Sequence, residues 1–173
     1  MQGKVENSLG DRITSAVHLY EAFGPLMMKD AMFRTLLFDL DRYIGETQRA
    51  MEVTGIAKEC ADCAVNGEGT CCGIRTGSKC SNTILFINLM MGKILPRVPA
   101  YPGLCHFLTA YGCSLRARPV ICVNFTCRRL RDRIPHKALC GVQEIAGKEI
   151  HALFIFEEYV KKKMTAASGG AGS

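Results

Sequence analysis

Cysteines dominate the chemistry that this chain could perform. Ten cysteines lie in 173 residues, and eight of them form one ordered series in the middle of the chain. The eight are Cys60, Cys63, Cys71, Cys72, Cys105, Cys113, Cys122 and Cys127. Thiolates are soft, strongly donating ligands, and closely spaced thiolates beside glycine-rich turns are typical of zinc sites and iron–sulfur clusters. The series therefore predicts a metal- or cluster-binding centre.

The even number of cysteines also fits a set of disulfides, which is the main alternative. The first residues lack the charged and apolar regions of a secretory signal, so we expect a cytoplasmic, reducing location in which thiols persist. A chain of this length can also bury about 70% of its extended surface without covalent cross-links. Both considerations favour metal ligation over disulfides.

The first group of cysteines follows the pattern Cys60-x2-Cys63-x7-Cys71-Cys72. In a C-x2-C turn two sulfurs can converge on one metal while backbone amides stabilise their negative charge. Adjacent side chains diverge, so we expect one residue of the Cys71–Cys72 pair to bind the metal. The other would bridge to a second site, support the first or pack in the core, and a strained disulfide between the two is an alternative.

The second group follows the pattern Cys105-x7-Cys113-x8-Cys122-x4-Cys127. Its spacings match neither the paired C-x2-C knuckles of a zinc ribbon nor the cysteine run of a ferredoxin. Alone it is ambiguous, and its significance comes from following the first group. Of the two cysteines outside the series, Cys80 could be a ligand or a core residue, and we expect Cys140 to be an ordinary core residue.

The two groups together resemble the YkgJ-type cysteine-cluster family. The residues that carry the resemblance lie within 57–130 and are Cys60-x2-Cys63, Cys71-Cys72, Gly103-x-Cys105-x-Phe107-Leu108, Gly112-Cys113 and Arg118-Pro119-x2-Cys122-x2-Phe125. That family is described as a zinc- or iron-chelating domain. The resemblance implies that the first seven cysteines of the series chelate the metal, with Arg118 and Pro119 shaping the last turn. Cys127 lies outside the family pattern and is an additional candidate ligand.

Basic residues gather at the end of the series. Seven lysines and arginines against one aspartate give residues 116–137 a net charge of +6, equal to that of the whole chain. The candidate partner surface comprises Arg116, Arg118, Arg128, Arg129, Arg131 and Arg133. Guanidinium groups would stabilise an anionic 4Fe–4S centre, so we favour an iron–sulfur cluster, with zinc as the alternative. Nucleic acid is a weaker candidate partner because few aromatic residues are present for base stacking, and a solvated loop without a partner is the third possibility.

No phosphate-binding loop, dinucleotide fingerprint or nucleophile elbow is visible, so whether the protein is an enzyme stays open. The leading hypothesis is an iron–sulfur protein that serves electron transfer, redox sensing or a larger redox system, with a redox protein as partner. The alternative is a structural zinc module that presents the basic surface to nucleic acid or protein. A redox enzyme with an open iron position is a third hypothesis.

These ligands need elements that position them, and we expect a mainly α-helical single domain over 1–164. Hydrophobic residues at 48% and charged residues at 22% are typical of a globular protein. An N-terminal arm, 8–54, should hold one helix from Ser8-x-x-Asp11 to residue 23 and a second over 27–53. Gly24-Pro25 should separate them.

Helical arms should pack around an irregular cysteine-rich centre at 57–130. We expect no regular element in the glycine-rich stretch 57–82, and a buried helix or short strand from residue 83. A C-terminal helix should cover 137–164 with Lys161–Lys163 in its last turn, followed by a flexible tail at 165–173. No apolar run reaches the roughly 18 residues that span a bilayer. Metal binding would contribute directly to folding.

Overall fold

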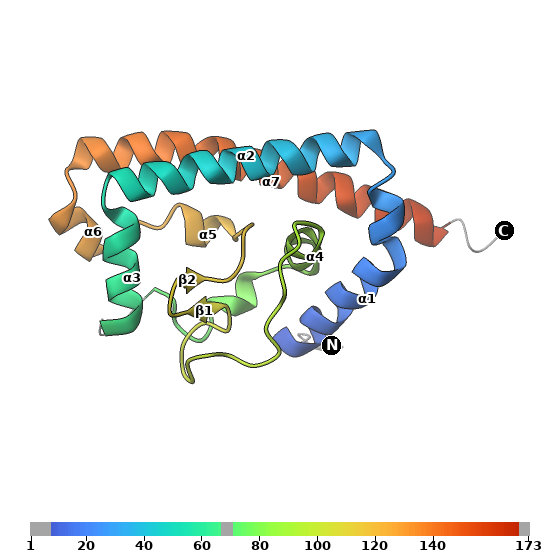
Figure 1. Ribbon diagram of the computed structural model, residues 1–173, viewed down its shortest axis with the longest axis horizontal. Coiled ribbons are helices and arrows are strands. Elements are labelled where there is room, and N and C mark those ends of the chain that lie inside the picture. The colour runs from blue at the N-terminus through green and yellow to red at the C-terminus, as the bar shows by residue number, and fades with distance from the viewer. Residues whose placement is uncertain (1–7, 67–70, 170–173) are drawn as a thin grey trace, which may run out of the picture.

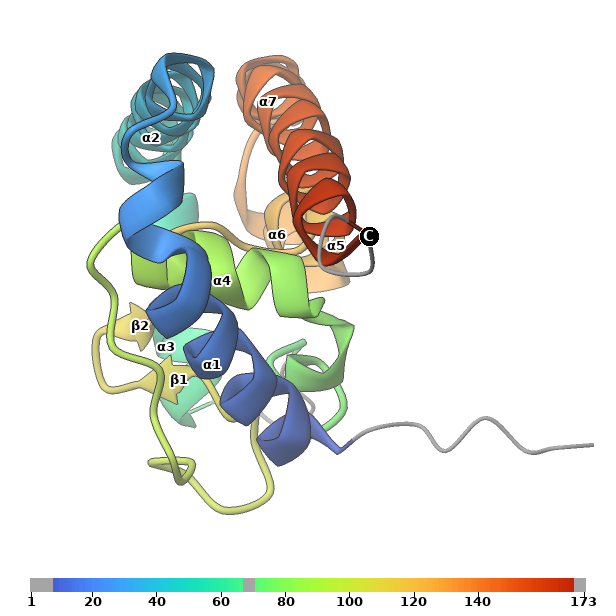
Figure 2. The same cartoon turned by 90° about the vertical axis from the view of Figure 1, so that its right-hand side faces the viewer.

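The computed structural model describes residues 8–66 and 71–169, and the fold is mainly helical as predicted. The elements are α1 (Leu9–Met27), α2 (Ala31–Val53), α3 (Ile56–Asn66), the 3-10 turn η1 (Gly77–Lys79), α4 (Asn82–Met90), β1 (Leu108–Thr109), β2 (Gly112–Cys113), α5 (Val120–Val123), α6 (Arg128–Arg133) and α7 (His136–Gly169). The long helices α2 and α7 run side by side in opposite directions, and the shorter elements lie on one side of this pair (Figure 1). Figure 2 shows α4 and α1 on that same side.

Capping residues define the start of the first two helices. The Ser8 hydroxyl accepts a hydrogen bond from the amide of Asp11 at 3.2 Å, and the Asp11 carboxylate accepts one from the Ser8 amide at 3.0 Å. This reciprocal arrangement satisfies amide groups that the first helical turn leaves unpaired. The Asp30 carboxylate accepts from the Met32 amide at 2.9 Å and so caps α2. The predicted capping at Ser8 is confirmed.

The predicted break at Gly24-Pro25 is wrong, because α1 continues through Pro25 to Met27. A proline within a helix leaves one carbonyl, four residues earlier, without its amide donor. Here that carbonyl belongs to Glu21, which is exposed and can be hydrated. Including the proline so close to the end of the helix therefore costs little stability.

The main core lies between α2, α4 and α7. Phe33 of α2 and Phe156 of α7 are fully buried, and their rings meet edge to face with centroids 4.9 Å apart. Phe86 of α4 approaches the other side of Phe33 at 6.5 Å. Burying each such ring contributes about 1.5–3 kcal/mol to folding. This aromatic contact fixes the long helices as the frame on which the shorter elements are placed.

Two smaller hydrophobic clusters flank the cysteine-rich centre. The second cluster joins α1 and α4 to the chain around residues 105–115 and includes Leu85, Phe107 and Leu108. The third lies where α3, α6 and the start of α7 meet, and consists of Ile56, Leu130, Ile134, Leu139 and Val142. The centre is thus supported from two sides by separate apolar clusters.

Predictions at both ends of the centre are corrected. Residues 56–66 form α3, although we expected no regular element over 57–82. For the apolar segment that follows, the predicted helix is confirmed by α4 and the strand alternative is excluded. The last helix continues to Gly169, so the tail does not begin at residue 165, and Lys161–Lys163 do not lie in the final turn. Lys163 instead binds Asp30 at 2.7 Å, which anchors α7 to the start of α2. Residues 67–70, with part of the predicted glycine-rich stretch, and 170–173 lie outside the described residues.

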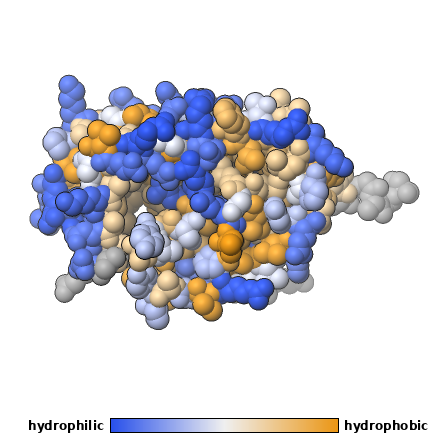
Figure 3. All heavy atoms as spheres, in the orientation of Figure 1, coloured by the Kyte–Doolittle hydropathy of each residue, from blue (hydrophilic) through white to orange (hydrophobic). Residues whose placement is uncertain are grey.

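The exposed surface is mixed in character. Hydrophilic side chains dominate the end that contains α3 and α6, whereas hydrophobic ones are more frequent in the half that contains α1 (Figure 3). Within the described ranges, no helix combines the length and apolar character needed to cross a membrane.

Candidate metal centre

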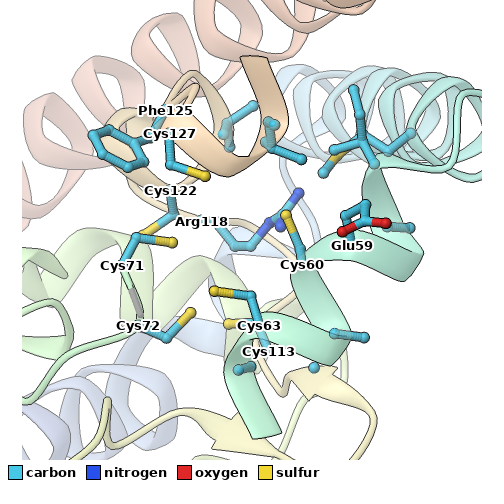
Figure 4. Close-up of a pocket in the computed structure, with 18 of the residues that line it drawn as sticks. Glu59, Cys60, Cys63, Cys71, Cys72, Cys113, Arg118, Cys122, Phe125 and Cys127 are labelled. Carbon is cyan, nitrogen blue, oxygen red and sulfur yellow. The ribbon is translucent and has the colours of Figure 1, made fainter. Parts of the chain in front are cut away.

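A cavity brings the eight predicted cysteines together. It has a volume of 620 Å³ and lies between α3, the segment after residue 70, β2 and the α5–α6 region. The cysteines in its lining are Cys60, Cys63, Cys71, Cys72, Cys105, Cys113, Cys122 and Cys127. Figure 4 shows seven of them, drawn with their sulfur atoms around a common space. Two stretches that are far apart in the sequence therefore contribute thiols to one site.

Helix α3 presents Cys60 and Cys63 to this cavity. The two residues are three positions apart, so their side chains lie on the same helical face. Our expectation that the C-x2-C pattern forms a turn is therefore corrected, because it lies within regular helix. The helix ends at Asn66, and its first turn follows Gly55, whose φ of 79° needs a residue without a side chain.

The Cys71–Cys72 pair is held beside Cys105 by backbone pairing. The amide of Cys105 donates to the carbonyl oxygen of Cys72 at 2.8 Å, and Gly73 forms an antiparallel bridge with Leu104. The Thr76 hydroxyl donates to the carbonyl oxygen of Cys71 at 2.8 Å. These contacts connect the end of the first cysteine group to the beginning of the second.

The remaining three cysteines come from short elements. Cys113 ends β2 and pairs across the two-stranded sheet with Leu108. Cys122 lies in α5, which begins directly after Pro119, and its amide donates to the Pro119 carbonyl oxygen at 2.8 Å. Cys127 is the residue that precedes α6. The proline thus begins the turn that carries Cys122, in agreement with its implied role.

Arg118 places a positive charge among these thiols. Its side chain lines the cavity and extends between the labelled cysteines (Figure 4). Its buried Nε and Nη2 atoms have no hydrogen-bond partner within residues 8–66 and 71–169. Buried guanidinium nitrogens without partners are costly unless an anion lies nearby. Thiolates bound to a metal would supply that negative charge, so Arg118 fits an anionic centre.

Burial controls the protonation of the thiols. Burial raises the pKa of Cys60 to about 11, and the charges of Cys71, Cys127 and Cys63 raise it further. Burial likewise raises the pKa of Cys122 to about 11 and that of Cys113, and at all three the charge of Arg118 opposes the rise. The hydrogen bond from Cys72 lowers the pKa of Cys71. At neutral pH most of these thiols therefore carry protons, which a soft cation would displace on binding.

The thiols surround a space rather than a point. Within the described parts of the chain, no three His, Cys, Asp or Glu side chains are close enough together to hold a single metal ion. A single zinc needs four sulfurs at about 2.3 Å, which places the sulfurs roughly 3.8 Å from one another. No two of the ten cysteines, all of which are described, are joined by a disulfide. Tight binding of one ion would require the cavity walls to move inward.

The other two cysteines and His106 lie elsewhere. Cys80 is buried in the second hydrophobic cluster and does not line the cavity. Cys140 is not the core residue that we expected: it is partly exposed on α7, with its Sγ 3.7 Å from Nδ1 of His136. Nε2 of His106 lies 2.7 Å from the carbonyl oxygen of Pro96, and His106 does not line the cavity.

The predicted basic surface is only partly directed outward. Arg116 binds Asp41 at 2.7 Å, and Arg129 binds Glu59 at 2.9 Å and also contacts Asp62. Their acidic partners are distant in sequence, so counting charges within 116–137 could not reveal them. The exposed remainder consists of Arg128, Arg131 and Arg133, and of these Arg133 also reaches Glu59, at 3.0 Å.

Asn88 positions the segment that carries Arg118, and no sequence pattern singles it out. The side chain is fully buried in α4. Its Nδ2 donates to the carbonyl oxygens of Ile84 and Ala117, each at 2.8 Å. Its Oδ1 accepts from the amide of Arg116 at 2.7 Å and from that of Ala117 at 3.2 Å.

Glu149 is a second functional candidate that the sequence did not indicate. It lies on α7 with 1% of its surface exposed, and neither carboxylate oxygen has a hydrogen-bond partner in the described part of the chain. Burial raises the pKa of Glu149, while the nearby Thr47 hydroxyl and the charges of Arg118 and Arg116 partly oppose the rise. A buried acid therefore lies behind the arginine that faces the thiols. The only sequence feature that could have indicated Glu149 is its position on an otherwise amphipathic helix.

Comparison with known proteins adds no assignment. No family model, no curated protein and no solved structure matches the chain. The resemblance to the YkgJ-type family therefore stays a prediction.

Proposed function

We propose that the protein binds a thiolate-ligated metal centre in the cavity between α3, β2 and α5, and that the centre is an iron–sulfur cluster of the 4Fe–4S type. The observation that carries this proposal is the convergence of eight cysteines from two distant stretches on one cavity. Such a concentration of soft donors suits iron–sulfur clusters and zinc better than harder cations, which prefer oxygen ligands.

Two features support a cluster over a single zinc ion. The thiols surround 620 Å³, a space wider than the compact tetrahedron of sulfurs that one zinc requires. Arg118 also offers a partly buried positive charge to the centre, with its buried Nε and Nη2 atoms unpaired within residues 8–66 and 71–169. Opposite charge close to an iron–sulfur cluster stabilises its more reduced, more negative state and so raises its reduction potential.

The role that follows is electron transfer or redox sensing in a reducing compartment such as the cytoplasm. A bound cluster supplies a one-electron couple at this site. The residues of the chain hold it: the cysteines provide thiolates, Arg118 balances charge, and Leu108 and Leu115 form apolar parts of the wall. Apolar walls limit water around the centre, which tunes its potential.

A redox protein with an acidic surface is the partner that the cavity rim favours. Tyr111, Ile121 and Phe125 line the cavity and are exposed by 99%, 52% and 51% respectively. Arg75 and Lys79 line the same cavity and are exposed. An apolar patch beside positive charges suits a transient contact with a partner of opposite charge.

Anaerobic purification followed by iron, zinc and acid-labile sulfide analysis tests the proposal. We expect a brown protein in which iron and sulfide are present in similar amounts and which bleaches on reduction. A colourless protein with stoichiometric zinc would replace the cluster by the structural zinc alternative. Protein without bound metal after anaerobic reconstitution would refute both.

A further inference from the structure

Two complementary charged groups lie without partners beside the inner wall of the cavity. Both carboxylate oxygens of Glu149 and the Nε and Nη2 atoms of Arg118 are closed to solvent, and none of them has a hydrogen-bond partner within residues 8–66 and 71–169. Nε and Nη2 are guanidinium nitrogens whose N–H bonds can point side by side, and together they match the two oxygens of one carboxylate. Each group therefore lacks what the other offers.

The fold brings the two groups together from distant parts of the sequence. Ala117, which precedes Arg118, belongs to the main core together with Leu153 of α7. Ala146 of α7 lines the cavity with Arg118. Glu149 lies between Ala146 and Leu153 on the buried face of the same helix, about one turn from each. Its carboxyl group is thus placed behind the cavity wall, at the level of the segment 117–118.

Arg118 is the cation that can serve Glu149. Two positive charges, those of Arg118 and Arg116, act on the carboxyl group. Arg116 is already bound to the carboxylate of Asp41 at 2.7 Å and also contacts Gln48. Of the two arginines, Arg118 is the one with buried donor atoms that have no partner in the described part of the chain. Arg118 is therefore the available counter-charge.

The elements that pack against α7 add no further charge near Glu149. These elements are α2, α4 and α5. The buried face of α2 contributes the hydroxyl of Thr47, α4 contains no charged residue, and α5 contributes the thiol of Cys122, which lines the cavity. On α7 itself the neighbouring Lys148 and His151 are exposed. Apart from the two arginines, the buried surroundings of the carboxyl group in the described residues are therefore neutral.

The surroundings of Glu149 also suit a protonated carboxyl group. Thr47 is fully buried, and its hydroxyl donates to the carbonyl oxygen of Tyr43 at 3.1 Å. The Thr47 oxygen keeps lone pairs that can accept a hydrogen bond, which a neutral carboxyl group can donate and a carboxylate cannot. Burial raises the pKa of Glu149, and the charge of Arg118 opposes the rise. Glu149 therefore holds its proton more firmly when other anions compensate that charge.

Arg118 also faces the cysteines. Its side chain lines the cavity and extends toward Cys60 (Figure 4). Cysteines that bind a metal become thiolates, and four thiolates around a divalent ion leave a net negative charge. These thiolates would take over as the counter-charge of Arg118. A carboxylate behind the same wall would then add negative charge to a poorly solvated region, which is unfavourable.

From this arrangement we infer that Glu149 is a positioning residue of the site: its carboxylate balances Arg118 while the thiols are protonated, and it takes up one proton when metal-bound thiolates become the counter-charge. Each protonated cysteine that binds metal releases one proton to solvent, and Glu149 removes one proton from solvent. The net release is smaller by that one proton. The inference deepens the proposed function and rests on it.

Proton release on metal binding tests the role of Glu149. Reduced protein is titrated anaerobically with Zn²⁺ alone by calorimetry, in buffers of different ionisation enthalpy and at a series of pH values. Above the pKa of Glu149 in the metal-free protein, we expect wild type to release about one proton fewer than Glu149→Gln. The variant should also bind Zn²⁺ more tightly than wild type, by a factor that increases with pH.

Two further variants isolate the cause. Glu144→Gln, on the exposed face of the same helix, is the matched control and should release as many protons as wild type. In an Arg118→Gln background, replacing Glu149 by Gln should leave proton release unchanged, because burial without the opposing charge keeps the carboxyl group protonated throughout. A loss of packing alone would not depend on Arg118 in this way.

The outcomes separate this inference from the proposed function. Equal proton release by wild type and Glu149→Gln at every pH, with Zn²⁺ bound, would overturn the inference and leave metal binding intact. A wild-type protein that binds neither Zn²⁺ nor iron would refute the proposed function, and the inference with it. Should circular dichroism show that Glu149→Gln does not fold, infrared difference spectroscopy of wild type decides. Zn²⁺ should increase the absorption of protonated carboxyl groups, and unchanged absorption would overturn the inference.

Discussion

The guanidinium of Arg129 binds the carboxylate of Glu59 at 2.9 Å, and this ion pair joins two elements that carry candidate ligands. Glu59 precedes Cys60 in α3, and Arg129 lies two residues after Cys127 at the start of α6. Arg133 binds the same carboxylate at 3.0 Å. The acid thereby ties the helix that carries Cys60 and Cys63 to the helix that follows Cys127.

Replacing Glu59 by Gln should weaken metal retention without removing a ligand. The two arginines lower the pKa of Glu59, so the carboxylate is charged at neutral pH and the substitution removes both ion pairs. The loss should be smaller than that caused by Cys60→Ser, because these partly exposed pairs contribute modestly. Competition with a chelator at low salt measures it, with Glu144→Gln, on the exposed face of α7, as the control. Equal retention in the two variants would contradict this bracing role.

Asn88 should contribute more to stability than any exposed polar residue. Asn88→Leu leaves the amides of Arg116 and Ala117 buried without a partner, and each such loss costs about 1–3 kcal/mol. We expect the free energy of unfolding to fall by about 3 kcal/mol or more. Urea denaturation of the metal-free proteins measures this difference, with Asn82→Ala at the start of the same helix as the control. A change below about 1 kcal/mol would show that these hydrogen bonds do not fix the segment.

The buried Glu149 should make stability depend on pH. Because burial raises its pKa in the folded state, the folded protein holds the proton at pH values at which the unfolded chain has released it. Its contribution is therefore fully present below the ordinary glutamate range and is lost as pH rises toward the folded-state pKa. Glu149→Gln should remove this loss, so the variant should gain stability relative to wild type as the pH rises above the ordinary glutamate range. Urea unfolding at a series of pH values from that range upward measures the difference in stability, and a difference that does not change with pH would disprove the assignment.

Arg118 should support the centre through charge. Arg118→Gln removes the charge that opposes the raised pKa of Cys60, Cys113 and Cys122, so protons should compete more effectively with the metal. Residues around a ligand set typically change metal affinity 10- to 100-fold, and we expect a loss of about tenfold. Arg118→Lys, which keeps the charge, should restore part of the lost metal affinity. Chelator competition at several pH values measures the effect, and full recovery of binding in the Gln variant at high pH would support this cause.

Local sequence patterns predicted most of the helices. The Ser8–Asp11 pattern indicated the start of α1, and the apolar periodicity of 27–53 indicated α2, which begins four residues later than expected. The predicted break at Gly24-Pro25 was wrong because local propensity takes no account of whether the carbonyl that the proline leaves unpaired is exposed to water. The helix α3 was missed because the cysteine pattern was interpreted as a turn, although a three-residue spacing also suits one face of a helix.

The cysteines of the candidate site were predicted, but its surroundings were not. The cysteine series, together with the resemblance to the YkgJ-type family, indicated the eight residues that the structure places around one cavity. The separate hydrophobic clusters beside Cys60 and Cys72 could not be predicted, because only the fold brings their residues together. Asn88 and Glu149 could not be recognised, because a polar residue in an apolar or amphipathic segment gains its role from partners distant in sequence.

Differential alkylation followed by mass spectrometry tests most directly whether the cavity cysteines share bound metal. Anaerobically isolated protein is treated with one alkylating reagent, then unfolded with a chelator and treated with a second. We predict that the eight cavity cysteines, including the exposed Cys71 and Cys113, react only with the second reagent, whereas the partly exposed Cys140 reacts with the first. Rapid first-stage labelling of Cys71 and Cys113, or cavity cysteines recovered as disulfide-linked pairs, would contradict the proposed centre.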